Sequence, residues 1–235
     1  MIIIPDIHGR TFWKDVINGR EEQEITFLGD YSDPYATEGI TDDDAIANFK
    51  EILSFKKAHP KNVTLLIGNH DQHYLSNDYS KGSRYCFQQS KEYQKLLTEN
   101  RKDFRLCTDF TTEYGKYVII SHAGISRGWK DMFFKDIDDK KLVDFLNNSY
   151  LVEDEKLPFY LSCISFYRWG DSPFGSITWA DINELASNNN TPFVGDFQIF
   201  GHTQLQSNPL ITENFACLDV RRGFEVDKNC KIIRL

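Results

Sequence analysis

The chain has 235 residues, of which 40% are hydrophobic and 26% charged, and its formal net charge is −8 at pH 7. This length is enough for one large α/β domain or two small ones, and the composition is ordinary for a folded protein. The acidic balance argues against a nucleic-acid backbone as the main partner, because proteins that bind one concentrate positive charge. A small phosphorylated substrate held through metal ions stays compatible with this charge.

Cysteine usage and the amino-terminal residues indicate a cytoplasmic protein. The five cysteines include no CxxC pair, so we expect reduced, mostly buried thiols. The apolar start at residues 1–5 is too short for a signal peptide, and Asp6 interrupts it. No uninterrupted apolar run approaches the ~20 residues that a membrane span needs. We therefore expect no membrane association and no obligate partner.

The first half of the chain alternates short apolar runs with helical patterns. Strands are expected at residues 2–4, 24–28 and 63–67. A short helix is expected at residues 11–17, with Thr11 as its cap. A longer helix is expected at residues 41–58, because Thr41 and Asp44 form a capping-box pattern. The aspartates at positions 42–44 are interpreted as charges that stabilise the helix start, not as metal ligands.

The second half continues with strands and includes one segment of different character. A helix is expected at residues 93–100, and strands at residues 105–109, 117–120, 197–200, 216–220, 224–226 and 231–234. Residues 126–172 are rich in aromatic and mixed-charge side chains and are interpreted as a cap-like insertion, with helices near residues 127–134 and 138–148. The alternation predicts an α/β fold with an antiparallel element at its C-terminal end, in a single domain spanning residues 1–235.

Polar motifs follow five of the apolar runs. The central motif is Gly68-Asn69-His70-Asp71, expected on the loop after the run at residues 63–67. The other four are Asp6-Ile7-His8-Gly9, Gly29-Asp30-Tyr31-Ser32-Asp33, Ser121-His122-Ala123-Gly124 and Gly201-His202-Thr203. Open α/β sheets bind their ligands at the carboxyl ends of strands. We therefore expect these polar side chains to contribute to one site.

The motifs together supply the ligands of a metal site. Taken singly, each is weak evidence, since a lone buried histidine is more often a core residue. As a set they offer carboxylate, amide and imidazole donors from Asp6, His8, Asp30, Asn69, His122 and His202. Such donors suit Mn, Fe, Zn or Co better than Ca or Mg alone. The set is large enough for two ions if one carboxylate bridges them, and two ions ~3.5–4 Å apart clamp a phosphate and lower the pKa of a bound water.

The order of the motifs resembles that of the calcineurin-like metallophosphoesterase superfamily. The resemblance covers residues 6–220, and the spacing is most similar to PPP-type serine/threonine phosphatases and to symmetric dinucleoside tetraphosphate hydrolases. It implies a fold in which a two-sheet β-sandwich is flanked by helices, here with a small helical cap. It also implies two divalent metal ions, for which we expect Mn, with Fe, Zn, Co or Ni as alternatives.

The resemblance also implies roles for individual residues. The metal ligands would be Asp6 and His8 on the first ion, Asp30 as the bridge, and Asn69, His122 and His202 on the second. Asp33 would orient His70, and His70 would donate a proton to the leaving oxygen. A metal-bridging hydroxide would attack phosphorus directly, so that no covalent intermediate is required.

One position departs from the phosphatase pattern. PPP-type phosphatases carry an arginine after the second aspartate of the GDxxD motif, where it grips the phosphate, whereas this chain has Pro34 there. Bidentate binding by arginine contributes strongly to phosphate affinity, so another arginine is expected to replace it. Arg84 and Arg127 are favoured, because each lies shortly after a metal-binding motif. The further candidates are Arg10 and Arg168.

The predicted function is hydrolysis of phosphomonoesters, on a phosphorylated protein or a small phosphorylated substrate. The alternative is a dinucleoside polyphosphate hydrolase, which a closed pocket with stacking aromatics would favour. The aromatics available for stacking are Trp129, Phe133, Phe134, Tyr167 and Trp169. A catalytically silent binding module is disfavoured by the complete ligand set, and a nuclease by the acidic charge and by Gln204 in its final motif. His73 is expected at the surface, with a place next to the metal ligands as the alternative.

Overall fold

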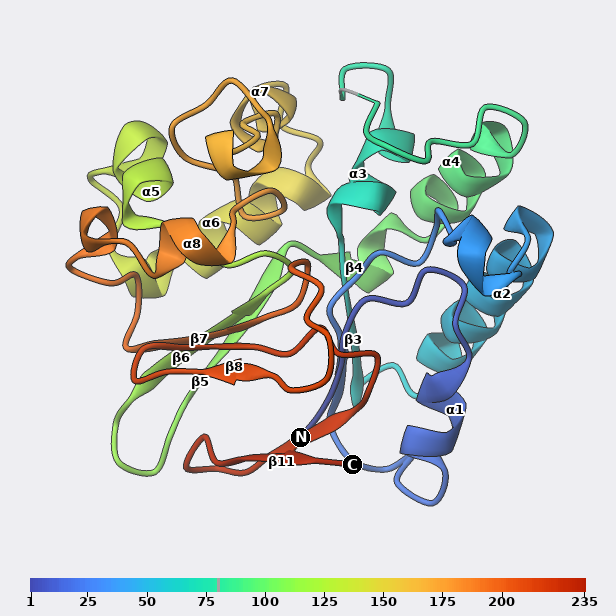
Figure 1. Ribbon diagram of the computed structural model, residues 1–235, viewed down its shortest axis with the longest axis horizontal. Helices are drawn as coiled ribbons and strands as arrows, with labels where there is room; N and C mark the ends of the chain where they lie inside the picture. Colours follow the sequence, from blue (N-terminus) through green and yellow to red (C-terminus); the bar gives the residue numbers. More distant parts are fainter. Residues whose placement is uncertain (80) are drawn as a thin grey trace. The chain divides into compact units, whose positions relative to one another are not determined.

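The computed structural model describes residues 1–79 and 81–235. The chain forms two compact units, shown in Figure 1. Unit 1 comprises Met1–Phe104, Arg221–Val226 and Ile232–Leu235, and unit 2 comprises Arg105–Val220 and Asp227–Lys231. Each unit contains one mixed β-sheet with helices beside it, which confirms the predicted α/β class with two sheets flanked by helices.

The sheet of unit 1 has the strand order β11-β10-β1-β2-β3-β4. The strands are β1 (Ile2–Ile4), β2 (Ile25–Phe27), β3 (Val63–Leu66), β4 (Phe104–Arg105), β10 (Phe224–Val226) and β11 (Ile232–Arg234). The central strands β1, β2 and β3 run parallel, with Ile3 beside Thr26 and Thr26 beside Thr64. The hairpin β10–β11 joins β1 antiparallel, as the sequence predicted for the C-terminal end.

Four helices accompany this sheet. They are α1 (Phe12–Ile17), α2 (Asp42–Ala58), α3 (Asn69–Leu75) and α4 (Ser90–Glu99), with 3-10 turns at Ala36–Glu38 and Arg101–Asp103. The start of α2 is a complete capping box, in which the Thr41 hydroxyl accepts from the Asp44 N–H and the Asp44 carboxylate accepts from the Thr41 N–H. The expected cap of α1 is absent, since the Thr11 side chain makes no capping hydrogen bond.

The core of unit 1 is built from aromatic side chains between helices and sheet. Trp13 of α1 meets Phe27 of β2 edge to face, with ring centroids 5.7 Å apart. Tyr31 stacks on Phe49 of α2 at 4.7 Å and also contacts Phe104. Each such fully buried ring contributes about 1.5–3 kcal/mol by leaving water. In Figure 1, α1, α2 and α4 lie on the same side of the parallel strands.

The sheet of unit 2 has the order β5-β6-β7-β9-β8. Its strands are β5 (Cys107–Thr111), β6 (Tyr117–Ser121), β7 (Phe197–Phe200), β8 (Leu210–Ile211) and β9 (Phe215–Cys217). Strands β6, β7 and β9 are parallel, and β5 and β8 are antiparallel edges. Strand β8 was not expected, because two residues are too few for an alternating pattern. The strand predicted at residues 216–220 ends earlier, at Cys217.

The helices of unit 2 are α5 (Arg127–Phe134), α6 (Asp139–Leu151), α7 (Leu157–Leu161) and α8 (Ile182–Leu185), with 3-10 turns at Phe166–Arg168 and Asn188–Asn190. Helices α5 and α6 match the two predicted for the cap-like segment, whereas α7 was not expected. Helix α6 is tied to β5, because the Asn147 amide accepts from the Leu106 N–H and donates to the Cys107 carbonyl. The cap-like segment is therefore anchored directly on the sheet of its own unit.

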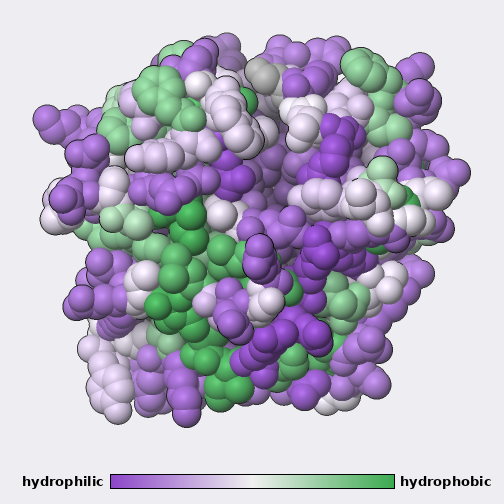
Figure 2. Space-filling model, viewed as in Figure 1, coloured by the Kyte–Doolittle hydropathy of each residue, from purple (hydrophilic) through white to green (hydrophobic). Residues whose placement is uncertain are grey.

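The surface offers few large apolar areas. Most of the face in Figure 2 is hydrophilic, and an apolar area lies where Figure 1 draws β8. Leu210 and Ile211 of this edge strand are about half exposed. All five cysteines are free thiols, but only Cys107 and Cys217 are fully buried, fewer than expected. Among the described residues, no helix combines the length and apolar character needed to cross a bilayer.

Candidate metal centre

The three parallel strands of unit 1 end side by side, and a predicted motif follows each of them. Asp6 and His8 follow β1, Asp30 and Asp33 follow β2, and Asn69 follows β3. The loops after β1 and β2 are hydrogen-bonded to each other, because the His8 N–H donates to the Asp30 carbonyl at 2.6 Å. The structure therefore gathers these unit 1 motifs at one edge of the sheet, as the sequence predicted.

Two glycines allow the loops after β2 and β3 to touch. A Cβ atom on Gly29 would lie 2.5 Å from the backbone nitrogen of Gly68, and Gly29 has a φ of +110°. A Cβ atom on Gly68 would overlap the Asp30 carboxylate. Only glycine permits this approach of two backbones. The position of Asp30 against the start of α3 thus depends on both glycines.

A buried carboxylate, Asp71, fastens the same two loops. Its Oδ2 accepts hydrogen bonds from the Asp30 N–H at 2.7 Å and the Gly68 N–H at 2.9 Å. Its Oδ1 accepts from the Tyr31 N–H at 2.8 Å. No role was predicted for Asp71, although an acidic residue three positions after a helix-capping residue is a known signal of a helix start. Asn69 accordingly lies in the first turn of α3, not on a loop as expected.

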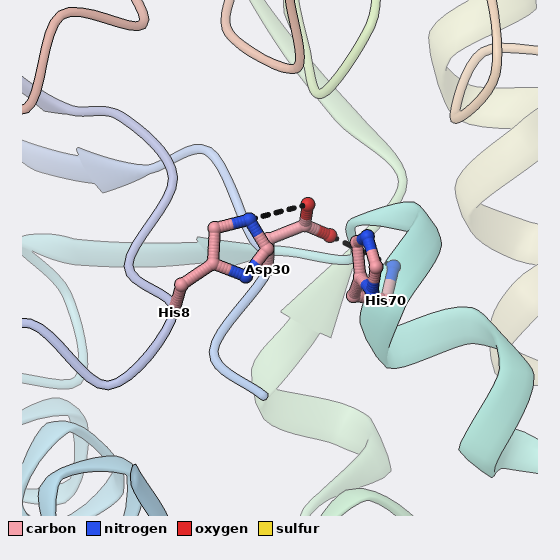
Figure 3. Close-up of side chains that lie close together, drawn as sticks. All are labelled: His8, Asp30 and His70. Atoms are coloured by element: carbon pink, nitrogen blue, oxygen red, sulfur yellow. Dashed lines mark hydrogen bonds and ion pairs between the residues drawn. The ribbon is translucent and has the colours of Figure 1, made fainter. Parts of the chain in front are cut away.

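His8, Asp30 and His70 form the centre of the unit 1 site (Figure 3). The Nε2 atom of His8 lies 3.4 Å from Asp30 Oδ2, and Asp30 Oδ1 accepts from the His70 backbone N–H at 2.8 Å. The Nδ1 atom of His8 donates to the Ser32 carbonyl at 2.9 Å. A carbonyl can only accept, so the proton is on Nδ1 and Nε2 presents a lone pair. This tautomer is the one that a metal-binding histidine uses.

The electrostatics of this group favour a bound cation. Burial, together with the nearby Asp6 carboxylate, raises the pKa of Asp30 well above its ordinary value. Burial and the positive neighbours of His8 lower the pKa of its imidazole well below the ordinary value. Two buried carboxylates repel each other unless a positive charge lies between them, and a neutral imidazole is ready to coordinate. The residues therefore fit a divalent metal ion.

His70 lies between a carboxylate and a guanidinium. Its Nδ1 is 2.7 Å from Asp33 Oδ2, and its Nε2 is 2.9 Å from an Nη atom of Arg84. Arginine has donors only, so Nε2 of His70 accepts and Nδ1 donates to Asp33. Burial lowers the pKa of His70 to about 4, against the opposing effect of Asp33 and with a smaller contribution from Arg84. The His70 imidazole is thus neutral in this structure, with its proton directed at Asp33.

The four candidate arginines for a phosphate have different partners. Arg84 donates to the Asp33 carbonyl at 2.9 Å and stacks over the Tyr35 ring, 3.7 Å from its centroid. Arg10 makes a two-bond ion pair with the Glu38 carboxylate. The other two arginines belong to unit 2. Arg127 is bound by the Asp139 carboxylate and by the carbonyls of Pro192 and Phe193, and Arg168 contacts Asp181 and Thr203. Of the four, the structure places Arg84 beside His70.

The predicted ligands of unit 2 meet at the ends of two parallel strands. His122 follows β6 and His202 follows β7, and the Gly201 N–H donates to the His122 carbonyl at 2.8 Å. The Nε2 atom of His122 lies 3.1 Å from Nδ1 of His202. Trp179 meets the His202 ring edge to face at 5.8 Å. The structure thus brings the two predicted histidines together within their own unit.

The backbone around the predicted site residues is unusual. Among the described residues, nine other than glycine have a positive φ, and five of these are predicted site residues: His8, Asp30, Asp33, Arg84 and His202. Such a conformation costs energy for residues with a side chain and persists only where the surroundings impose it. Strain of this kind is concentrated at functional sites.

Comparison with known proteins agrees with this geometry. The family profile described as calcineurin-like phosphoesterase matches residues 2–206. The chain belongs to this family. A similar solved structure is a serine/threonine phosphatase from Saccharomyces cerevisiae, which is described as similar to human phosphatase PP5. The two structures align with a TM-score of 0.52 and 14% sequence identity, and the alignment covers 100% of this chain and 78% of that one. Likeness at this identity shows the fold alone. No curated protein matches the chain.

The calcineurin-like phosphoesterase family, whose members generally depend on two metal ions, accounts for the donors gathered in this chain. In unit 1 of this phosphoesterase, donor atoms of His8, Asp30 and His70 all lie within 4.8 Å of one another. Asp6 and Asn69 are buried on the neighbouring loop and helix turn. Asp33, His70 and His73 form a second such group. The phosphoesterase is thus a hydrolase with candidate metal-binding groups among its described residues.

Proposed function

We propose that this phosphoesterase is a dinuclear metal-dependent phosphatase that hydrolyses phosphomonoesters. The observation that carries the proposal is the row Asp33–His70–Arg84, which places an oriented imidazole and a guanidinium beside the His8–Asp30 group. The proposed ligands are Asp6, His8, Asp30, Asn69, His122 and His202. The inclusion of the two unit 2 histidines is supported by the order of the motifs in the family and by their contact with each other.

Two bound divalent ions would supply positive charge for the phosphate and a water of lowered pKa. The chain's own residues supply the rest. His8 offers the lone pair of Nε2 because Ser32 holds its other nitrogen. Asp33 holds the Nδ1–H of His70, so that Nε2 is the atom from which the leaving oxygen receives its proton. A carboxylate in this position fixes the orientation of the ring and stabilises the imidazolium that must form.

Arg84 is the proposed phosphate-binding side chain. In this structure its guanidinium donates to His70 Nε2. A phosphate dianion is a much stronger acceptor than a neutral imidazole, so the incoming phosphate takes over these donors. This exchange frees Nε2 and brings an anion next to it, which raises the pKa of His70 and favours the protonated form needed for catalysis.

A second substrate class, the dinucleoside polyphosphates, is favoured by one surface feature. Trp169 is 96% exposed and Tyr167 is 55% exposed. Both lie beside Arg168, which contacts Asp181 and also Thr203, the residue after His202. Exposed aromatic rings that are held rigidly are suited to stacking on nucleobases. The other predicted stacking residues pack within the helices of unit 2. They are Trp129, Phe133 and Phe134, of which the first and last are buried.

The test is hydrolysis by metal-free protein with and without added Mn²⁺. The substrates are para-nitrophenyl phosphate, a phosphoserine peptide and diadenosine tetraphosphate. We expect metal-dependent turnover of the two monoesters above that of the dinucleotide. Faster turnover of the dinucleotide, lost in a Trp169→Ala variant, would select the second class. Turnover of none of the three by protein shown to hold two ions would contradict the proposal.

A further inference from the structure

Helix α3 carries a second buried histidine, His73, three residues after His70. We expected His73 at the surface, but its side chain is buried, with only 1% of the residue exposed. Residues three apart on a helix lie on the same side, and the two imidazole rings are 5.5 Å apart. The Nε2 atom of His73 lies 2.8 Å from Asp33 Oδ2, the same oxygen that His70 contacts at 2.7 Å. One oxygen of Asp33 therefore lies within 3 Å of two imidazole rings.

The hydrogen bond on the other side of His73 shows which nitrogen carries the proton. The Gly82 N–H donates to His73 Nδ1 at 3.1 Å. Nδ1 must therefore offer a lone pair, and the proton of the neutral ring is on Nε2, the nitrogen that lies 2.8 Å from Asp33 Oδ2. A metal-binding histidine would need the reverse arrangement, with the lone pair facing the ion. In the group of Asp33, His70 and His73, the ring nitrogens nearest the carboxylate consequently carry protons and offer no lone pair to an ion, although the donor atoms are close enough to hold one.

The remaining oxygen of Asp33 is also occupied. The Tyr74 hydroxyl donates to Oδ1 at 2.5 Å, and the Cys86 N–H donates to that hydroxyl at 2.8 Å. Three side chains of α3 thus surround one fully buried carboxylate. They are those of His70, His73 and Tyr74. A carboxylate held on both oxygens cannot rotate without breaking a buried hydrogen bond.

We propose that His73 is a positioning residue for phosphoester hydrolysis. Its Nε2–H holds Asp33 in the orientation that keeps the Nδ1–H of His70 bound and aims Nε2 of His70 at the leaving oxygen. The inference rests on the proposed function, in which His70 is the proton donor. A positioning role can be told apart from a packing role. If His73 acts through His70, its loss should lower the rate most for substrates whose leaving group most needs a proton.

The experiment compares two monoesters with Mn²⁺ present: phenyl phosphate, whose leaving group is basic, and para-nitrophenyl phosphate, whose leaving group is not. In His73→Phe the ring volume is kept and the donor is lost. We expect kcat on phenyl phosphate to fall about ten- to a hundredfold, with a smaller fall on para-nitrophenyl phosphate and no change in KM. His73→Gln, which restores a donor, should recover most of the rate. His70→Asn should show the same leaving-group dependence, more strongly.

Leu75→Ala is the matched control on the same helix. Leu75 is buried and has no polar side-chain atom to offer Asp33, so this variant destabilises α3 and should change both rates by the same factor. Equal losses on the two substrates in His73→Phe would overturn the inference and leave a packing role. If His70→Asn also showed equal losses, or the unaltered protein were inactive, the proposed function itself would fail.

A second readout is independent of turnover. Nitrogen-15 NMR of labelled histidine side chains in the metal-free protein reports the tautomer of each ring. We expect His73 to carry its proton on Nε2. In His73→Gln we expect the signal of the His70 Nδ1–H to move, and this variant serves as the test if His73→Phe does not fold. A proton on Nδ1 of His73 would overturn the inference, whatever the activity.

Discussion

Arg84 donates a hydrogen bond to Nε2 of His70 at 2.9 Å, although 14 residues separate them in the chain. The segment after α3 folds back on this helix, because Lys81 caps its carbonyl groups and the Gly82 and Cys86 N–H groups bind side chains of the helix. This return places the guanidinium at the atom from which His70 would release a proton. In the proposed mechanism, Arg84 would couple phosphate binding to proton donation.

Arg84→Ala should raise KM for a phosphomonoester. A hydrogen bond from a charged group contributes about 1.5–3 kcal/mol, which corresponds to a ~10- to 100-fold increase in KM. The measurement is steady-state kinetics with para-nitrophenyl phosphate, and Arg222→Ala, which removes an exposed arginine of the same unit, is the control. An equal rise in Arg127→Ala, with none in Arg84→Ala, would return the phosphate contact to Arg127.

Asp71→Asn should destabilise unit 1 and weaken metal binding together. The buried carboxylate accepts from three backbone N–H groups, and an amide in its place would turn its NH₂ group toward one of them. The cost of leaving such a group unsatisfied is about 1–3 kcal/mol. Urea denaturation and Mn²⁺ titration calorimetry measure the two effects. Asp15→Asn, at an exposed position of α1, is the control. Unchanged stability would show that the three bonds contribute little.

Asp30→Asn should abolish binding of Mn²⁺ and, with it, hydrolysis. The substitution removes a buried carboxylate that Asp6 repels and that a bound cation would stabilise. Because that repulsion is relieved, the metal-free variant should be at least as stable as the unaltered metal-free protein. Metal content by mass spectrometry and thermal unfolding without metal check the two halves of this prediction. A variant that still binds two ions would remove Asp30 as their bridge.

The Asp139 carboxylate should make unit 2 sensitive to acid. Burial raises its pKa, but the hydrogen bonds from Arg127 and the Gly195 N–H outweigh this, so the pKa of Asp139 is lowered overall. A folded pKa below the unfolded value stabilises the protein above about pH 4, and this contribution disappears as the pH falls through the folded pKa. Urea denaturation from pH 7 to pH 3 should therefore show Asp139→Asn less stable at neutral pH, with the difference vanishing in acid. A pH-independent difference would contradict this prediction.

The sequence by itself was sufficient for the features that neighbouring residues determine. The three β-branched residues of β1 and the capping box of α2 specify their elements locally. The order of the polar motifs was sufficient to predict the family, because it resembles the order in the calcineurin-like superfamily. Each motif comes shortly after a strand, and parallel strands end at a common edge of their sheet. Asp6, His8, Asp30, Asn69, His122 and His202 are accordingly placed as the strand pattern predicted, each within its unit.

Tertiary structure decided which side chains surround those motifs. Arg84 and Arg127 looked equivalent in the sequence, but the chain's return over α3 brings only Arg84 to His70, while Asp139 holds Arg127. His73 was expected at the surface, and the GNHD motif on a loop. Once Asn69–Leu75 is a helix, the spacing of three residues turns His73 toward Asp33. These contacts join residues that are distant in the chain. Burial of side chains in the folded structure stabilises them, and a local sequence pattern does not show which distant residues will be buried together.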